Sequence, residues 1–241
     1  MKRLVLLACV LFSFLGVQAQ RTYVLVCGVS QYDDPTGACV DLNYPAKGAK
    51  TMRNVYNNAG FVTSILTSQH VTEENVMERL NAIVRIAQPD DKIIFQFIGH
   101  GSQGMIHLYK GLPFLYSKLM VTLSKARTDK VFCIIDACQS GSAIDVAEYM
   151  QDTKSAFLMA CRAEESTLET AVIASPVFTM ALSKGLRGRA DINGDRQVTL
   201  MELFRYIHSD VVSRGKALGV QIHPQLLGNN KLFDTVLTKI K

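Results

Sequence analysis

The stretch VFCIIDACQSG, residues 131–141, decides how the chain is to be interpreted. An apolar run, typical of a strand covered on both faces, leads directly into Asp136 and Cys138, and Gln-Ser-Gly follows as a turn. In α/β proteins, the groups that carry chemistry lie where strands end and loops begin. The stretch therefore predicts a buried strand whose end presents a carboxylate and a thiol.

Strand-like and helix-like patterns alternate on both sides of this stretch. The strand-like runs lie at residues 22–29, 61–68, 92–101, 130–138 and 154–161. The helix-like runs lie at residues 44–60, 71–88, 113–127, 176–186 and 199–215. This alternation is typical of an α/β fold with a mostly parallel sheet of about six strands and helices on both faces. No repeat or proline-rich linker divides it, so we expect one domain over residues 20–241.

Capping residues mark several of the expected helix ends. Gly60 suits a left-handed C-terminal cap, because glycine adopts positive φ without strain. Thr72 has the position of an N-cap, and Thr199 and Glu202 have the spacing of a capping box. The helices are therefore expected to end or begin at these residues.

The first 19 residues have the pattern of a secretory signal peptide. Lys2 and Arg3 precede an apolar run over residues 4–17, and small residues lead to an expected cut after Ala19. The apolar run is shorter than the roughly 20 residues of a membrane span. Its removal takes away two basic residues and changes the formal charge from +5 to +3. We therefore expect an exported protein, periplasmic or extracellular, with no membrane span; no lysine-arginine run indicates nucleic acid.

Five cysteines remain after such a cut, and an odd number leaves at least one thiol unpaired. Cys27, Cys133 and Cys161 lie in strand-like runs, where cysteine usually acts as a small hydrophobic residue. Cys138 differs from them because it follows a strand and precedes a turn. It is the candidate for chemistry.

A second strand end carries a matching group. Residues 95–101, FQFIGHG, end in His100 between two glycines. If the two strands run parallel, His100 and Cys138 lie at the same edge of the sheet, and imidazole is the usual base for a thiol. The N–H groups of Gly101 and Cys138 are candidates for an oxyanion hole. The pair of strand ends favours a Cys–His catalytic site.

These two motifs, with IIDACQSG at 134–141, resemble those of caspase-like cysteine peptidases, particularly the bacterial caspase-like and metacaspase branch. The resemblance extends to VLVCGVSQY at 24–32 and to residues 175–203, and so to nearly the whole exported chain. It implies a three-layer caspase-like sandwich and an endopeptidase that needs no cofactor. In it Cys138 would be the nucleophile and His100 the general base and acid, acting on a peptide or protein through a thioacyl-enzyme. A catalytically silent caspase-like binding module is the alternative.

Asp136 is the candidate substrate-binding residue. It lies two residues before Cys138, so both side chains can face one side of the cleft, and a carboxylate there favours a basic substrate side chain. In metacaspase-like enzymes, which cleave after Arg or Lys, a second acid often lies in the first helix, where this chain has Gly48. A turn-capping role for Asp136 is the alternative. Other acids considered for the same pocket are Asp33, Asp34 and Asp41.

The segment DINGDRQVTLME, residues 191–202, has the spacing of a calcium loop. The candidate ligands are Asp191, Asn193, Asp195 and Glu202. The sixth position requires a sharp turn and holds Arg196 in place of glycine. We therefore expect a plain turn that leads into the next helix, with calcium as the lesser reading.

Weaker candidates complete the set. HGSQG at 100–104 approximates a serine nucleophile elbow around Ser102, but His100 replaces its first glycine. His100, His107 and Cys138 lack the close spacing of zinc ligands. Self-cleavage after Lys154 or Arg162 is implied by the resemblance alone, and residues 223–229 are expected to form a loop.

Overall fold

A computed structural model describes residues 19–143, 154–163 and 177–240. The expected signal peptide therefore lies almost wholly outside the described residues. The described part is built on a six-stranded sheet in the order β10-β8-β7-β3-β1-β2. Its strands are β1 (Thr22–Gly28), β2 (Val62–Thr67), β3 (Lys92–Ile98), β7 (Val131–Asp136), β8 (Ser155–Met159) and β10 (Gln225–Gly228). All neighbouring pairs are parallel except β10 with β8, which confirms the expected mostly parallel α/β sheet.

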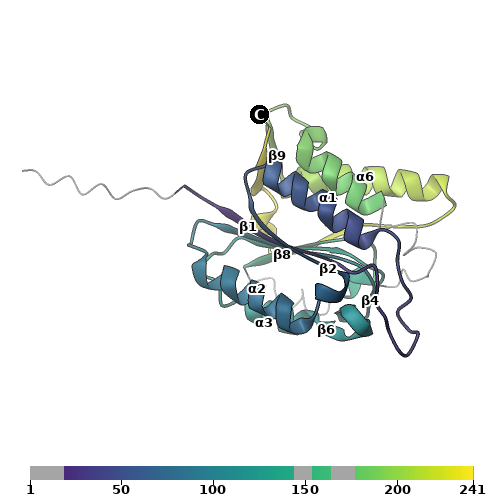
Figure 1. Ribbon diagram of the computed structural model, residues 1–241. Coiled ribbons are helices and arrows are strands. Elements are labelled where there is room, and N and C mark those ends of the chain that lie inside the picture. The colour runs from purple at the N-terminus through teal and green to yellow at the C-terminus, as the bar shows by residue number, and fades with distance from the viewer. Residues whose placement is uncertain (1–18, 144–153, 164–176, 241) are drawn as a thin grey trace, which may run out of the picture.

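Helices cover both faces of this sheet (Figure 1). One face carries α2 (Glu73–Ile86) and α3 (Tyr116–Leu123). The other carries α1 (Pro45–Asn58), α6 (Leu200–Ala217) and the helical residues 177–184. Each layer encloses its own hydrophobic cluster against the sheet, so the molecule has the three-layer form that was expected.

The central strands explain why the sheet needs two covering layers. Every residue of β1, β3 and β7 is buried, and their side chains alternate between the two clusters. A strand that is apolar on both faces is stable only when both faces are covered. The continuous apolar runs of the sequence are therefore the physical cause of the sandwich.

The capping residues act as predicted. The side chain of Thr72 accepts a hydrogen bond from the Asn75 N–H at the start of α2. Thr199 and Glu202 form a complete capping box at the start of α6. Gly60 follows α1 with a φ of +82°, the left-handed conformation that its sequence position indicated.

Two elements differ from the expectations. Residues 113–127 were expected to be helical throughout, but Pro113–Leu115 forms strand β6 and α3 begins only at Tyr116. β6 joins β4 (Gly101–Ser102) and β5 (Met105–His107) in a small separate sheet. Residues 223–229 contain the edge strand β10 where a loop was expected, because β8 offers them an unpaired edge.

The remaining elements close the sandwich near the chain end. A π-helical turn (Gly185–Arg189) continues residues 177–184, and β9 (Gln197–Thr199) pairs with β11 (Val236–Lys239). Short 3-10 turns lie at Ser68–His70, Tyr109–Gly111, Ser140–Ala143 and Asn230–Leu232. Among the described residues, no helix is long and apolar enough to cross a membrane.

Candidate active site

The two expected strand ends lie side by side. β3 and β7 are parallel neighbours whose last paired residues are Ile98 and Asp136. Just beyond that pair, the Gly99 N–H donates to the Asp136 carbonyl at 3.1 Å. His100 and Cys138 each follow this pair by two residues, so the fold brings them to neighbouring positions at the carboxyl edge of the sheet.

The backbones of the two motifs are in close contact. A Cβ atom added to Gly101 would lie 2.8 Å from the Cys138 carbonyl oxygen and 2.9 Å from the Cβ of Ala137. Any side chain at position 101 would force the two strand ends apart, since real Cβ atoms do not approach this closely. Gln139, immediately after Cys138, has a φ of +50°, so the chain turns sharply behind the sulfur. The motif glycine therefore allows the backbone of Ala137 and Cys138 to lie against the histidine motif.

His100 is held in one tautomer. Its Nε2 lies 2.7 Å from the Val40 carbonyl oxygen, which can only accept a hydrogen bond. Nε2 must therefore carry the proton, which leaves the lone pair on Nδ1. The Tyr32 hydroxyl accepts the His100 backbone N–H at 2.6 Å, and the two rings lie 4.8 Å apart between centroids. His100 is thus a neutral base with a fixed basic nitrogen.

The surroundings of His100 favour this neutral form. Burial lowers the pKa of the imidazole below its ordinary value of 6.5, and nearby His107 lowers it further. The hydrogen bond to Val40 opposes this shift but does not reverse it. At neutral pH the ring can therefore accept a proton.

The surroundings of Cys138 favour the thiol over the thiolate. Burial, followed by the nearby Cys161 and Asp136, raises the pKa of Cys138 to about 12. The backbone N–H of Cys138 itself acts in the opposite direction and lies close to the sulfur. The group at rest is a neutral thiol, which becomes a strong nucleophile only when a base takes its proton.

Asp136 is placed differently from the substrate contact that was expected. Its side chain is 1% exposed, and the Thr179 hydroxyl donates to its Oδ2 at 2.5 Å. Burial raises the pKa of the Asp136 carboxyl well above its ordinary range, against the stabilising hydrogen bonds from Thr179. The carboxyl therefore lies behind Thr179 and is shielded from solvent.

The three other acids considered for the pocket already have partners. Asp33 accepts a hydrogen bond from the Tyr109 hydroxyl, and Asp34 accepts one from the Cys39 N–H, each at 2.8 Å. Asp41 accepts one from the Tyr32 N–H at 2.8 Å. These carboxylates organise the loop after β1, and none of them lines the pocket beside Ile98.

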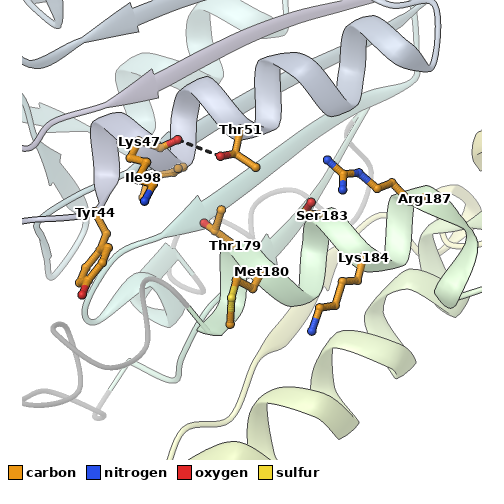
Figure 2. A pocket seen from close by; sticks show the side chains of 10 residues that line it. Tyr44, Lys47, Thr51, Ile98, Thr179, Met180, Ser183, Lys184 and Arg187 are labelled. Carbon is orange, nitrogen blue, oxygen red and sulfur yellow. Dashed lines mark hydrogen bonds between the residues drawn. The ribbon is translucent and has the colours of Figure 1, made fainter.

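That pocket lies between α1 and residues 177–189, with a volume of about 340 Å³ (Figure 2). Ile98 lines it two residues before His100, so the pocket adjoins the candidate pair. The remaining lining residues are Tyr44, Lys47, Gly48, Thr51, Thr179, Met180, Ser183, Lys184 and Arg187. It is the candidate pocket for a substrate side chain.

The weaker candidates are also placed. Ser102 and the Nε2 of His107 are 2.8 Å apart, and the His107 Nδ1 lies 3.1 Å from the Gly111 carbonyl oxygen. This pair links β4 to β5 next to His100. Among the residues that the structure describes, no group of three or more His, Cys, Asp and Glu side chains is arranged to hold a metal ion.

The candidate calcium loop forms a hydrogen-bonded turn. Asp191 accepts from the Gly194 N–H at 2.8 Å and from the Arg196 N–H at 3.1 Å. Asn193 and Asp195 accept from the N–H groups two residues further on, at 2.8 Å each. The turn thus uses the carboxylates as backbone acceptors.

Three contributors were missing from the sequence reasoning. Val40 orients the base, Tyr32 holds the histidine backbone, and Thr179 covers Asp136. Val40 acts through its carbonyl group, which every residue has, so no residue-type signal exists for it. The buried hydroxyls of Tyr32 and Thr179 could have been suspected, since a buried hydroxyl requires a partner.

The similarity to known proteins agrees with this geometry. A model of the peptidase C13 family matches residues 31–238. A crystal structure of a protein from Geobacter sulfurreducens is similar over 92% of this chain and 100% of its own, with 17% sequence identity and a TM-score of 0.67. At that identity the likeness shows the fold alone. No curated protein matches the chain. The family match confirms the resemblance to caspase-like cysteine peptidases.

Proposed function

The chain belongs to the peptidase C13 family, and we propose that it is a cysteine endopeptidase with Cys138 as nucleophile and His100 as general base and acid. The family supports a cysteine peptidase function with protein substrates. The observation that carries the residue assignment is the bond from His100 Nε2 to the Val40 carbonyl oxygen. It leaves Nδ1 as the basic nitrogen of a histidine whose strand end adjoins the one that carries Cys138.

The proposed reaction follows from these protonation states. His100 Nδ1 takes the proton of the Cys138 thiol as the sulfur attacks the peptide carbonyl carbon. The N–H groups of Gly101 and Cys138 donate to the oxyanion that forms. When the C–N bond breaks, the imidazolium returns its proton to the departing amine and a thioester remains. Water then loses a proton to His100 and attacks the thioester, which releases the new carboxyl group and the thiol.

Export and a single domain complete the proposal. The pattern over residues 1–19 supports secretion, with cleavage near Ala19. The six-stranded sheet contains both β1, from near the start of the described residues, and β10, from near their end, which supports one domain over residues 20–241. None of the proposed steps requires a cofactor.

A catalytically silent binding module is the second candidate. The raised pKa of the Cys138 thiol favours it, because an unassisted thiol with a pKa of about 12 reacts slowly at neutral pH. Rapid labelling of Cys138 by a thiol-reactive peptide probe excludes a silent module. Slow alkylation that does not depend on the peptide sequence supports it.

The deciding experiment is turnover of a mixed peptide library by Cys138→Ala. We expect at least a ~1000-fold loss of kcat/KM with an unchanged melting curve, because the nucleophile is removed from the surface of an intact sheet. Cys27→Ala removes a fully buried thiol from β1 and is the matched control, with turnover retained. Wild-type turnover by Cys138→Ala would refute the assignment.

A further inference from the structure

The side chains that line the pocket beside His100 indicate which substrate side chain the proposed peptidase accepts. Ile98 lines the pocket and pairs in register with Asp136 on β7. Both side chains face the layer of α1 and residues 177–184, at the ends of the strands that carry His100 and Cys138. A substrate side chain next to the scissile bond can therefore enter this pocket. The inference below rests on the proposed function.

The floor of the pocket is apolar. A Cβ atom on Gly48 would lie 3.2 Å from Ile98 Cδ1 and 3.5 Å from Thr179 Cγ2. The methyl groups of Ile98 and Thr179 therefore reach the α1 backbone at this point. The Thr179 hydroxyl is turned to Asp136, so the buried carboxyl does not reach the floor. A side chain at position 48 would thus require the Ile98 Cδ1 methyl group to shift by a few tenths of an ångström.

The rim of the pocket is cationic. Lys47 on α1 and Lys184 and Arg187 on the opposite wall all line it. Figure 2 shows the Arg187 guanidinium extending from its helix toward the α1 side. Within the described part of the chain, none of the three cations forms an ion pair. No described acidic residue lines the pocket, so its field repels a cation and attracts an anion.

We infer that this pocket selects a substrate with an acidic side chain, Asp or Glu, immediately before the scissile bond. The methylene groups of that side chain would pack on Ile98 and Met180, and its carboxylate would be attracted by the cations at either end of the rim, Lys47 and Arg187. Such charge-assisted contacts discriminate strongly against a basic side chain, which would face three like charges. The preference for Arg or Lys expected from Asp136 lacks a described carboxylate in the pocket.

The test is a peptide library that varies only the residue before the scissile bond, with Asp, Glu, Asn, Arg and Lys compared. We expect kcat/KM for Asp or Glu to exceed that for Arg or Lys by at least ~30-fold. Lys47→Glu combined with Arg187→Glu should reduce this ratio at least ~10-fold. Arg53→Glu makes the same charge change on the exposed side of α1, away from the pocket, and should leave the ratio unchanged.

The possible outcomes test the acidic preference and the proposed peptidase function separately. Cleavage after Arg or Lys, or equal cleavage after Asp and Asn, overturns the acidic preference and leaves the cysteine peptidase intact. An unchanged ratio in the double variant also overturns it. Absence of cleavage of every peptide, together with no labelling of Cys138 by a thiol-reactive peptide probe, overturns the proposed function itself.

Discussion

The two ends of the central sheet each hold a buried aspartate, and the two aspartates differ in the hydrogen bonds that they accept. At the amino end, Asp91 precedes β3; at the carboxyl end, Asp136 closes β7. The two side chains are 4% and 1% exposed, so burial alone does not distinguish them. Their hydrogen-bond partners do.

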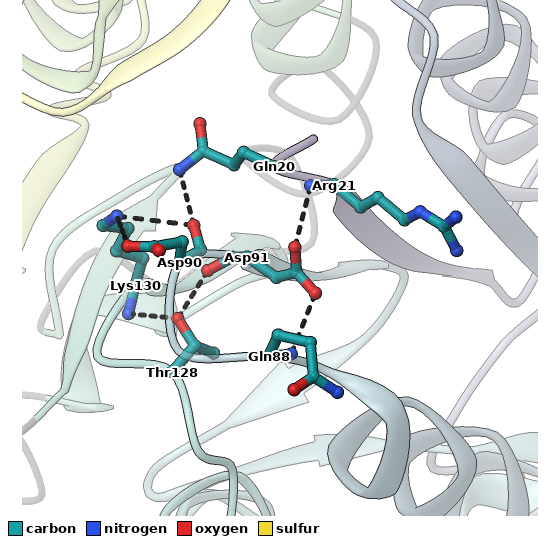
Figure 3. A network of polar contacts seen from close by, with 7 residues as sticks. All are labelled: Gln20, Arg21, Gln88, Asp90, Asp91, Thr128 and Lys130. Atoms are coloured by element: carbon teal, nitrogen blue, oxygen red, sulfur yellow. Dashed lines mark hydrogen bonds and ion pairs between the residues drawn. The ribbon is translucent and has the colours of Figure 1, made fainter. Parts of the chain in front are cut away.

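Asp91 lies in a network of polar contacts at the amino end of the sheet (Figure 3). Its two carboxylate oxygens accept the backbone N–H groups of Arg21 and Gln88, each at 2.8 Å. Its carbonyl oxygen accepts the Thr128 hydroxyl at 2.5 Å. The bonds from Arg21 and Thr128 tie this turn to the segments before β1 and β7, so the Asp91 network stabilises the amino end of the sheet.

Asp136 relies on a single residue, Thr179, which reaches it from a segment 43 positions further along the chain. Beside it lie His100, Cys138 and a pocket whose rim cations form no ion pair among the described residues. At the amino end the Asp91 carboxylate is bound within the chain, whereas at the carboxyl end three pocket cations have no ion pair among the described residues.

The largest effect expected from this comparison is the loss of unfolding free energy when Asp91 is replaced. Asp91→Ala leaves two partly buried N–H groups without their acceptors, so we expect a loss of about 1–3 kcal/mol in the free energy of unfolding. Urea titration measures it, and kcat/KM below the transition should change less than ~2-fold. Asp90→Ala is the matched control: its 90% exposed side chain is 3.7 Å from Lys130, an ion pair worth less than ~0.5 kcal/mol. Equal losses of unfolding free energy in the two variants would show that the Asp91 network does not stabilise this end of the sheet.

The smallest effect is expected at the other aspartate. The Asp136 carboxyl is buried and accepts one side-chain hydrogen bond from Thr179, and asparagine can accept the same bond. Burial raises the pKa of this carboxyl well above its ordinary range, so a neutral amide suits the site. Asp136→Asn should change kcat/KM less than ~3-fold on any peptide and stability by at most about 1 kcal/mol. A selective loss on Arg and Lys peptides would show instead that the ionised carboxylate binds substrate.

Much of this arrangement follows from the sequence. The apolar runs at β1, β3 and β7 dictate a sheet covered on both faces, and parallel order then brings His100 and Cys138 to one edge. Local signals such as the Thr199 cap are equally reliable, because their partners lie within one helical turn.

The features that the sequence does not predict depend on contacts between segments that are distant along the chain. The Val40 carbonyl and Thr179 reach the site from loops or helices whose approach no local pattern encodes. The charge of the pocket was missed for the same reason, since α1 contributes Lys47 and a helix 140 residues later contributes Arg187. Pro113–Leu115 became a strand because β5 pairs with it, against its helix-like composition.

The most direct test of the central claim is the rate at which a thiol-reactive peptide probe labels Cys138 as a function of pH. The lowered pKa of His100 keeps the base form available in mildly acidic solution, so the wild-type rate should rise through one ionisation below pH 6.5 and stay level to about pH 9. In His100→Asn the thiol must ionise alone, with a pKa of about 12, so labelling at pH 7 should fall at least ~100-fold and keep rising with pH. Identical profiles for the two proteins, both rising steadily to pH 9, would contradict a shared site for Cys138 and His100.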